Sequence, residues 1–133
     1  MEKSIDYGMK VLVVDDFATM RKIVRNILKQ IGFENISEAE DGTTALEFMK
    51  NEQVGLLVTD WNMPAMSGLD LLKHVRQNPK TSQLPVLMVT AEGLKDNVLE
   101  AVKAGVNNYV VKPFTAEVFQ EKIEAIFKKL AQA

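Results

Sequence analysis

The feature that most limits what this chain can fold into is a repeated alternation of two hydrophobic patterns. Short apolar runs of strand length alternate with longer segments in which apolar residues recur every three or four positions. We recognise five runs of the first kind and five segments of the second. This alternation predicts an α/β domain, in which helices cover both faces of an open, doubly wound parallel sheet.

The strands are expected at residues 11–14, 33–39 (a weaker edge strand), 56–58, 85–89 and 109–111. The helices are expected after residue 16, around residues 45–49, after Ser67, over residues 95–104 and after Thr115. The apolar stripes predicted for the first, fourth and fifth helices are Met20, Ile23, Val24, Ile27, Leu28 and Ile31; Val98, Ala101 and Val102; and Phe119, Ile123, Ile126, Phe127 and Leu130. Arg21 and Arg25 are expected on the outer face of the first helix, and residues 1–9 as a loose lead-in.

Length and composition suit one globular domain, residues 1–133, with no room for a separate output domain. The 16 basic and 18 acidic residues leave a net charge of −2, which gives no electrostatic case for binding nucleic acid or an anionic membrane. The chain has no cysteine, and no run has the length of a signal peptide or a membrane span. We therefore expect a cytoplasmic protein.

Polar residues follow four of the five expected strands. They are Asp15 and Asp16 after the first, Asp60 after the third, Thr90 after the fourth and Lys112 after the fifth. Because ligands of such sheets bind outside the carboxyl ends of the strands, we expect these side chains to converge on one edge. A purely structural acidic cluster, with Lys112 as a surface partner, is the alternative interpretation.

Three carboxylates brought together repel one another unless protons or a cation offset their charge. Oxygen ligands with no histidine or cysteine nearby favour Mg²⁺, which usually keeps several waters and joins a phosphate oxygen. Lys112 would add a positive charge, and Thr90 a hydroxyl donor. Together these groups suit an acyl phosphate formed by in-line attack of Asp60.

These motifs resemble the signature of the receiver domain of two-component response regulators. The resemblance rests on Asp15-Asp16, Asp60, Thr90 and Lys112-Pro113, and it extends over residues 10–130. Three strings resemble the chemotaxis members most closely: Asp-Trp-Asn-Met-Pro at 60–64, Pro-Val-Leu-Met-Val-Thr-Ala-Glu at 85–92 and Tyr-Val-Val-Lys-Pro-Phe-Thr at 109–115. The resemblance implies a flavodoxin-like fold of five parallel strands in the order 2-1-3-4-5 with five helices, and a cis bond between Lys112 and Pro113.

The resemblance also implies a role for each acid. Asp60 would accept phosphate from a phosphohistidine on a CheA-type histidine kinase. Mg²⁺ would be bound by the carboxylates of Asp16 and Asp60 and by the main-chain carbonyl of Asn62. Asp15 would act on the metal through a water molecule.

Further roles follow from the same resemblance. Thr90 and Lys112 would hold phosphoryl oxygens, and Asn62 and Glu92 would tune dephosphorylation. Inward movement of Thr90, with Tyr109 swinging from exposed to buried, would switch the output face. The protein would then be no enzyme in the ordinary sense, since it would catalyse only its own phosphoryl transfer and dephosphorylation.

The output face implied by the resemblance consists of the fourth helix, the fifth strand and the fifth helix. Its residues would be Gly93, Lys95, Val98, Val102, Tyr109, Val111 and Lys122. The implied partners are the histidine kinase, a flagellar motor switch protein and a CheZ-type phosphatase, with the receiver acting as a monomer that binds neither nucleic acid nor membrane.

Two other functions stay open at this point. A receiver can also act as a phosphate sink or relay whose target is not the motor. A magnesium-dependent phosphatase that forms an aspartyl phosphate would use similar groups, but its nucleophile usually ends the first strand in an Asp-x-Asp arrangement. Here the two acids after the first strand, Asp15 and Asp16, are adjacent.

Overall fold

The computed structural model describes residues 5–91 and 95–132, with only the backbone described at Lys95 and Asp96. Its strands are β1 (Lys10–Val14), β2 (Asn35–Ala39), β3 (Leu56–Asp60), β4 (Val86–Thr90) and β5 (Asn108–Val111). Its helices are α1 (Ala18–Ile31), α2 (Gly42–Asn51), α3 (Gly68–Gln77), α4 (Lys95–Lys103) and α5 (Ala116–Ala131). The predicted alternation of strands and helices is confirmed.

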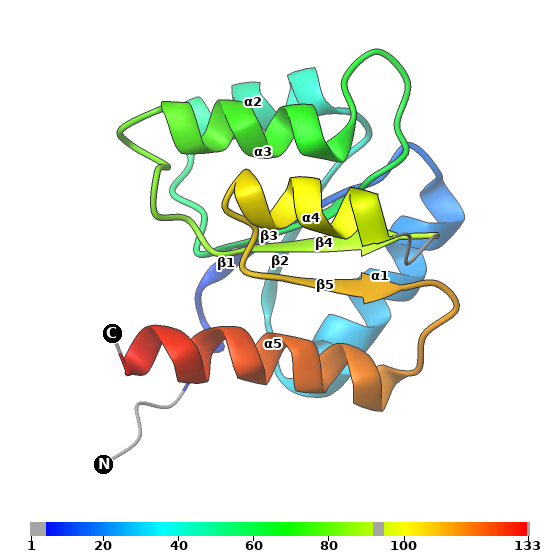
Figure 1. Cartoon of the computed structure of the whole chain (residues 1–133). Coiled ribbons are helices and arrows are strands. Elements are labelled where there is room, and N and C mark those ends of the chain that lie inside the picture. Colours follow the sequence, from blue (N-terminus) through cyan, green and yellow to red (C-terminus); the bar gives the residue numbers. More distant parts are fainter. Residues whose placement is uncertain (1–4, 92–94, 133) are drawn as a thin grey trace.

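The five strands form one parallel sheet in the order β2-β1-β3-β4-β5. Figure 1 shows α1 and α5 on one side of the sheet and α2, α3 and α4 on the other. The predicted flavodoxin-like fold and its strand order are therefore confirmed. The order reverses between β1 and β3, and the crevice at that point is where such sheets bind ligands.

The core has two halves because successive residues of a strand point to opposite faces of the sheet. Val11 and Val13 pack with residues of α1 and α5, whereas Leu12 and Val14 pack with residues of α2 and α3. The strands β3 and β4 are buried along their whole length. Asp60, at the end of β3, is therefore held in a fully buried central strand.

Two of the central strands extend further than their apolar runs suggest. β3 includes Thr59 and Asp60, and β4 includes Thr90. Asp60 is paired with Val89, and Thr90 with Val111, so backbone pairing continues after the apolar residues have ended. The residues expected just beyond the strands are thus held inside the sheet ladder.

The helix ends that frame the carboxyl edge are capped by side chains. Ser67 accepts a hydrogen bond from the backbone N–H of Asp70, and the Asp70 carboxylate accepts one from the backbone N–H of Ser67. Thr115 accepts one from the N–H of Val118 at the start of α5. The predicted start of α3 at Ser67 is confirmed.

Each of three helices exposes a residue of its predicted apolar stripe. Ile23 of α1 is 43% exposed, Val102 of α4 is 56% exposed and Leu130 of α5 is 41% exposed. The helical period selects an arc of residues that is wider than the strip touching the sheet, so the outer members of each stripe remain in solvent.

Among the described residues, no helix is both long and apolar enough to cross a membrane.

The expectation of a loose lead-in is wrong for residues 5–9. Ile5, Tyr7 and Met9 are partly buried against the α1–α5 half of the core. The ring centroids of Tyr7 and Phe33 lie 5.1 Å apart in an edge-to-face arrangement. The Tyr7 carbonyl also accepts a hydrogen bond from the N–H of Glu34 at 3.3 Å. This segment covers the amino end of the core.

Candidate functional site

The carboxyl edge of the sheet gathers the polar residues that the sequence places after four strands. Asp15 follows β1, Asp60 is the last residue of β3 and Thr90 is the last residue of β4. Lys112 follows β5, and its backbone N–H donates to the Thr90 carbonyl at 2.8 Å. The fold thus brings the predicted residues to one edge of the sheet.

Three carboxylates meet at this edge and are called the acidic group below. One oxygen from each of Asp15, Asp16 and Asp60 lies within 4.8 Å of the others. Asp15 and Asp60 are buried, with 4% and 5% of their surface exposed, whereas Asp16 is exposed. Two acids therefore form the floor of the site and the third borders solvent.

The ammonium of Lys112 lies directly against Asp60. Its Nζ is 2.7 Å from Oδ1 of Asp60, and only 6% of the Asp60 side chain is exposed. Because one partner is so well buried, solvent screens this charge-assisted hydrogen bond less than a surface ion pair. The bond between Lys112 and Pro113 is cis, as the family resemblance implies.

Burial raises the pKa of the Asp15 carboxyl above its ordinary value. The backbone N–H of Phe17, 2.9 Å from Oδ1, opposes this rise because it stabilises the carboxylate. The charge of Asp60 raises the pKa further, that of Lys112 lowers it, and that of Asp16 raises it slightly. The net result is a carboxyl group that holds its proton more readily than a free aspartate does.

The donor set fits a hard divalent cation. The three carboxylates and the one ammonium leave two uncompensated negative charges, which equals the charge that Mg²⁺ would bring. The chain has no cysteine, and its one histidine, His74, lies on the exposed surface of α3. Oxygen ligands without nitrogen or sulfur favour magnesium over the softer metals.

Two further predicted residues flank the acidic group. Thr90 is 4% exposed and directly follows Val89, the residue of β4 that pairs with Asp60. Asn62 is exposed in the loop that follows β3, two residues beyond Asp60. The binding of phosphate by the Thr90 hydroxyl and of metal by the Asn62 carbonyl stay predictions.

The loop after Asp60 is held close to the strand at Gly68. The Gly68 N–H donates to the Trp61 carbonyl at 2.8 Å. A Cβ atom at position 68 would overlap the main-chain oxygen of Asp60 and would lie 2.8 Å from Sδ of Met88. From the sequence Gly68 is only loop punctuation, but the structure shows that a close backbone approach requires it.

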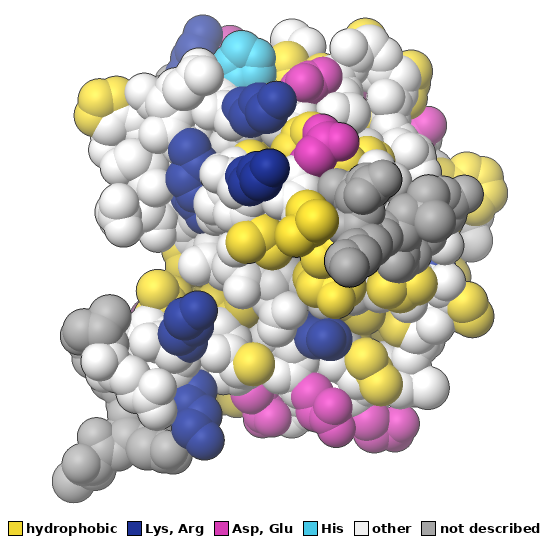
Figure 2. Space-filling model, in the orientation of Figure 1, with side chains coloured by type: hydrophobic (Ala, Val, Ile, Leu, Met, Phe, Trp, Pro, Cys, Tyr) yellow, Lys and Arg dark blue, Asp and Glu magenta, His cyan; other side chains and the backbone are white. Residues whose placement is uncertain are grey.

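The predicted output residues that the structure describes lie on α4, β5 and α5. Tyr109 is partly buried, and Nζ of Lys122 lies 5.3 Å from the centre of its ring. Val98 and Val111 are partly buried, and Val102 is mostly exposed. Figure 2 shows hydrophobic side chains gathered near the centre of this face, over α4 and β5.

Three predicted residues have no described side chain. Glu92 and Gly93 lie outside the described residues. Lys95 begins α4, but its side chain lies outside the described part of the chain as well. Their roles in dephosphorylation and target binding stay predictions.

The sequence interpretation missed three residues near the acidic group and the predicted output face. Leu99 of α4 is 47% exposed beside Val102, and Phe17 is 63% exposed directly after the acids of the first loop. Arg21 is not simply a surface residue of α1, because its Nη1 donates to the main-chain carbonyl of Asp15 at 2.6 Å. The spacing of three positions between Leu99 and Val102 could have indicated that both lie on the same side of α4. No local pattern indicates the contact between Arg21 and Asp15.

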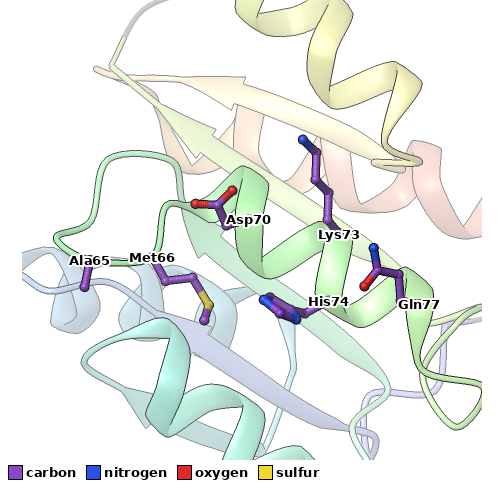
Figure 3. A pocket seen from close by; sticks show the side chains of 6 residues that line it. All are labelled: Ala65, Met66, Asp70, Lys73, His74 and Gln77. Atoms are coloured by element: carbon purple, nitrogen blue, oxygen red, sulfur yellow. The ribbon is translucent and has the colours of Figure 1, made fainter.

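Two hollows lie away from the acidic group. One, of about 320 Å³, runs along α3 and the loop before it and is shown in Figure 3; its lining residues are Ala65, Met66, Asp70, Lys73, His74 and Gln77. The other, of about 630 Å³, lies between the α2–β3 and α3–β4 connections. Neither contains a residue of the predicted site.

Known proteins are similar to this chain in sequence and in fold. The chain is 57% identical to the chemotaxis protein CheY of Pseudomonas aeruginosa over 122 residues, which cover 92% of this chain and 98% of the relative. It is 52% identical to the chemotaxis protein CheY-3 of Vibrio cholerae over 130 residues, which cover 98% of this chain and all of the relative. The solved structure of Vibrio cholerae CheY4 superimposes with a TM-score of 0.83 at 30% identity, over 90% of this chain and 98% of the other.

The family model of the response regulator receiver domain matches residues 11–124. Asp15, Asp60, Thr90 and Lys112 all lie within that range. The chain therefore belongs to the response regulator receiver domain family and is a receiver of the CheY chemotaxis type.

Proposed function

We propose that this chain is a phosphorylation-controlled binding module: Asp60 accepts a phosphoryl group, and the face formed by α4, β5 and α5 binds a target. The observation that carries the proposal is the 2.7 Å contact between Lys112 and Asp60, with two further carboxylates beside it. Structural acids are stabilised by separation or by pairing, whereas this group keeps uncompensated charge at a ligand-binding edge.

The proposed donor is a phosphohistidine of a histidine kinase. An oxygen of Asp60 attacks the phosphorus, so that an O–P bond forms as the P–N bond breaks. The imidazole leaves with the electron pair of that bond and takes up a proton. When bound at the acidic group, Mg²⁺ supplies positive charge for the phosphoryl oxygens.

The chain's own residues position the reacting groups. Lys112 already bonds one Asp60 oxygen, and its flexible side chain can follow the charge onto a phosphoryl oxygen. The Thr90 hydroxyl, at the end of the neighbouring strand, is the proposed donor to a second phosphoryl oxygen. Asn62 and Glu92 are proposed to control how water reaches the phosphorus. The protein thereby catalyses only its own phosphorylation and dephosphorylation.

The proposed output surface combines apolar and basic groups. Leu99 and Val102 expose nearly half or more of their surface on α4, and Tyr109 stands on β5 beneath the Lys122 ammonium. Exposed apolar patches often mark binding sites, and tyrosine is enriched among the residues that contribute most to binding. Movement of Thr90 toward a phosphoryl group would leave room for the Tyr109 ring to turn inward.

The similarity to CheY proteins supports a chemotaxis role with specific partners. We propose a CheA-type kinase as donor, a flagellar motor switch protein as target and a CheZ-type phosphatase as a further partner. The single receiver domain of residues 1–133 would act in the cytoplasm as a monomer.

The test is the affinity for a flagellar motor switch protein, measured with and without Mg²⁺ and beryllofluoride, which mimics the phosphoryl group. The proposal predicts a gain of about tenfold or more, equivalent to roughly 1.4 kcal/mol, in the wild type and none in Asp60→Asn. A wild type that accepts phosphate but shows no gain would be a phosphate sink or relay. A wild type that accepts no phosphate would overturn the proposal.

A further inference from the structure

We propose that Arg21 is a positioning residue for the acidic group: it fixes the main chain at Asp15 so that Asp15 and Asp16 can bind Mg²⁺. This inference rests on the proposed metal-dependent function. Arg21 lies on α1, the helix that begins at the carboxyl edge of the sheet (Figure 1). Its side chain is only 17% exposed, although the sequence pattern places it on the outer face of that helix.

The Arg21 guanidinium joins two elements at once. Its Nη1 donates to the main-chain carbonyl of Asp15 at 2.6 Å, and its Nε donates to Oε1 of Glu38 at 3.1 Å. Glu38 belongs to the edge strand β2, where it pairs with Val13 in the ladder with β1. The planar guanidinium can make both bonds in one orientation. Arg21 therefore ties the loop after β1 to the neighbouring strand.

Asp15 is held at three of its atoms. Its N–H donates to the Ala39 carbonyl at 3.2 Å, and its side-chain Oδ1 accepts from the N–H of Phe17 at 2.9 Å. The bond from Arg21 fixes the carbonyl, which begins the peptide unit leading to Asp16. Rotation of that peptide unit would move the Asp16 carboxylate, the one acid of the group that is exposed. The Arg21 contact is thus placed to control the geometry of both acids.

Loss of the Arg21 charge and loss of its contact with Asp15 would change the Mg²⁺ affinity in opposite directions. A cation beside the acidic group repels Mg²⁺, so loss of its charge alone would tighten metal binding. Loss of a contact that orients metal ligands weakens binding, typically by 10-fold to 100-fold. Glu38, which Arg21 shares with Arg25, offsets part of the Arg21 charge, and we expect the positioning effect to dominate.

Arg25 provides a matched control. Its Nη1 lies 3.2 Å from Oε2 of the same Glu38, one helical turn further along α1. The described contacts of Arg25 include Glu38 but not Asp15. Arg25→Gln therefore removes the same charge and one bond to the same carboxylate, while the Asp15 carbonyl keeps its donor.

The experiment titrates Mg²⁺ alone into the full chain and measures its affinity by calorimetry. We expect Arg21→Gln to bind Mg²⁺ about tenfold more weakly than wild type, Glu38→Gln to be weakened in the same direction, and Arg25→Gln to stay within twofold. At saturating Mg²⁺, acetyl phosphate should label Arg21→Gln at close to the wild-type rate, because the substitution changes only the metal affinity.

Several outcomes would overturn the inference. Equal or tighter binding by Arg21→Gln would show that only its charge matters, and equal weakening by Arg25→Gln would place the effect in Glu38 alone. If circular dichroism shows that Arg21→Gln does not fold, the Mg²⁺ affinities of Arg21→Lys and Arg25→Lys are compared instead. Weaker Mg²⁺ binding by Arg21→Lys alone supports the inference, and equal affinities of the two variants contradict it. A wild type that binds no Mg²⁺ would refute the proposed metal site instead.

Discussion

The ammonium of Lys112 reaches past strand β4 to bond the carboxylate of Asp60, at 2.7 Å between Nζ and Oδ1. The two residues are 52 positions apart in the sequence: Asp60 ends β3 and Lys112 follows β5, and these two strands are not neighbours in the sheet. Under the proposed function, this contact would share a cation between the attacking Asp60 oxygen and the incoming phosphate.

Replacement of Lys112 by methionine should separate metal binding from phosphoryl transfer. We expect Lys112→Met to take phosphate from acetyl phosphate about 100-fold more slowly than wild type, because one donor to the developing charge is lost. Its Mg²⁺ affinity, followed by the fluorescence of Trp61, should rise because a competing positive charge is gone. A variant with wild-type labelling rates would show that Lys112 is only a structural partner of Asp60.

Asp15→Asn should stabilise the metal-free protein at neutral pH. Burial raises the folded-state pKa of Asp15 above its ordinary value of 3.8, so between these two pKa values the folded state keeps a proton that the unfolded state has released. The free energy of unfolding therefore falls as pH rises through that window, and the loss persists above it. Asparagine carries no such charge and avoids the loss.

Urea unfolding without metal checks this expectation. The variant should be more stable than wild type at pH 7, and the difference should shrink as the pH approaches 3.8. Added Mg²⁺ should stabilise wild type more than the variant. A variant less stable than wild type at pH 7 without metal would contradict the account of the Asp15 pKa.

The sequence predicts the sheet and the position of its acids well, because both depend on local patterns. Short apolar runs mark the strands, and the polar residue at the end of each run must reach the same edge of a parallel sheet. Asp60 is the best example: its run, its loop and its place at the edge all follow from residues 56–68.

Contacts between distant residues could not be predicted in this way. Arg21 has the periodicity of a surface residue, and only the register of β2 against β1 brings Glu38 close enough to bond it. Tyr7 packs on Phe33 from a segment that has no periodic pattern at all. The exposure of Leu99 depends on how α4 lies on the sheet, which its own sequence does not determine.

Gly68→Ala should damage both stability and the phosphoacceptor site. The new methyl group would meet the main-chain oxygen of Asp60, which belongs to a buried strand and cannot move freely. Overpacking of this kind costs about 1–3 kcal/mol, and the shifted Asp60 should slow phosphorylation. Gly42→Ala is the control, because the three atoms nearest its methyl group would all belong to the side chain of Met66 and none to the backbone. Chemical unfolding of both variants should show the larger loss for Gly68→Ala; equal losses would argue against a fixed Asp60 backbone.

Thr90→Ala and Tyr109→Ala should separate phosphorylation from output. Without the Thr90 hydroxyl, phosphorylation should slow but still occur, and most of the phosphate-dependent gain in target affinity should be lost. Tyr109→Ala should accept phosphate normally and lose target binding, since Tyr109 belongs to the proposed output face, with the Lys122 ammonium over its ring. Target affinity with and without beryllofluoride measures both effects. Retention of the full gain by Thr90→Ala would show that the signal leaves through Lys112 or through the loop after Asp60.

The most direct test of the central claim is the site of phosphate uptake. The protein is incubated with acetyl phosphate, with and without Mg²⁺, and the labelled residue is identified by intact-mass and peptide mass spectrometry. We predict one phosphoryl group on Asp60, formed only when Mg²⁺ is present, and no labelling of Asp60→Asn. Undiminished labelling of Asp60→Asn, or uptake by wild type that is independent of Mg²⁺, would contradict the account.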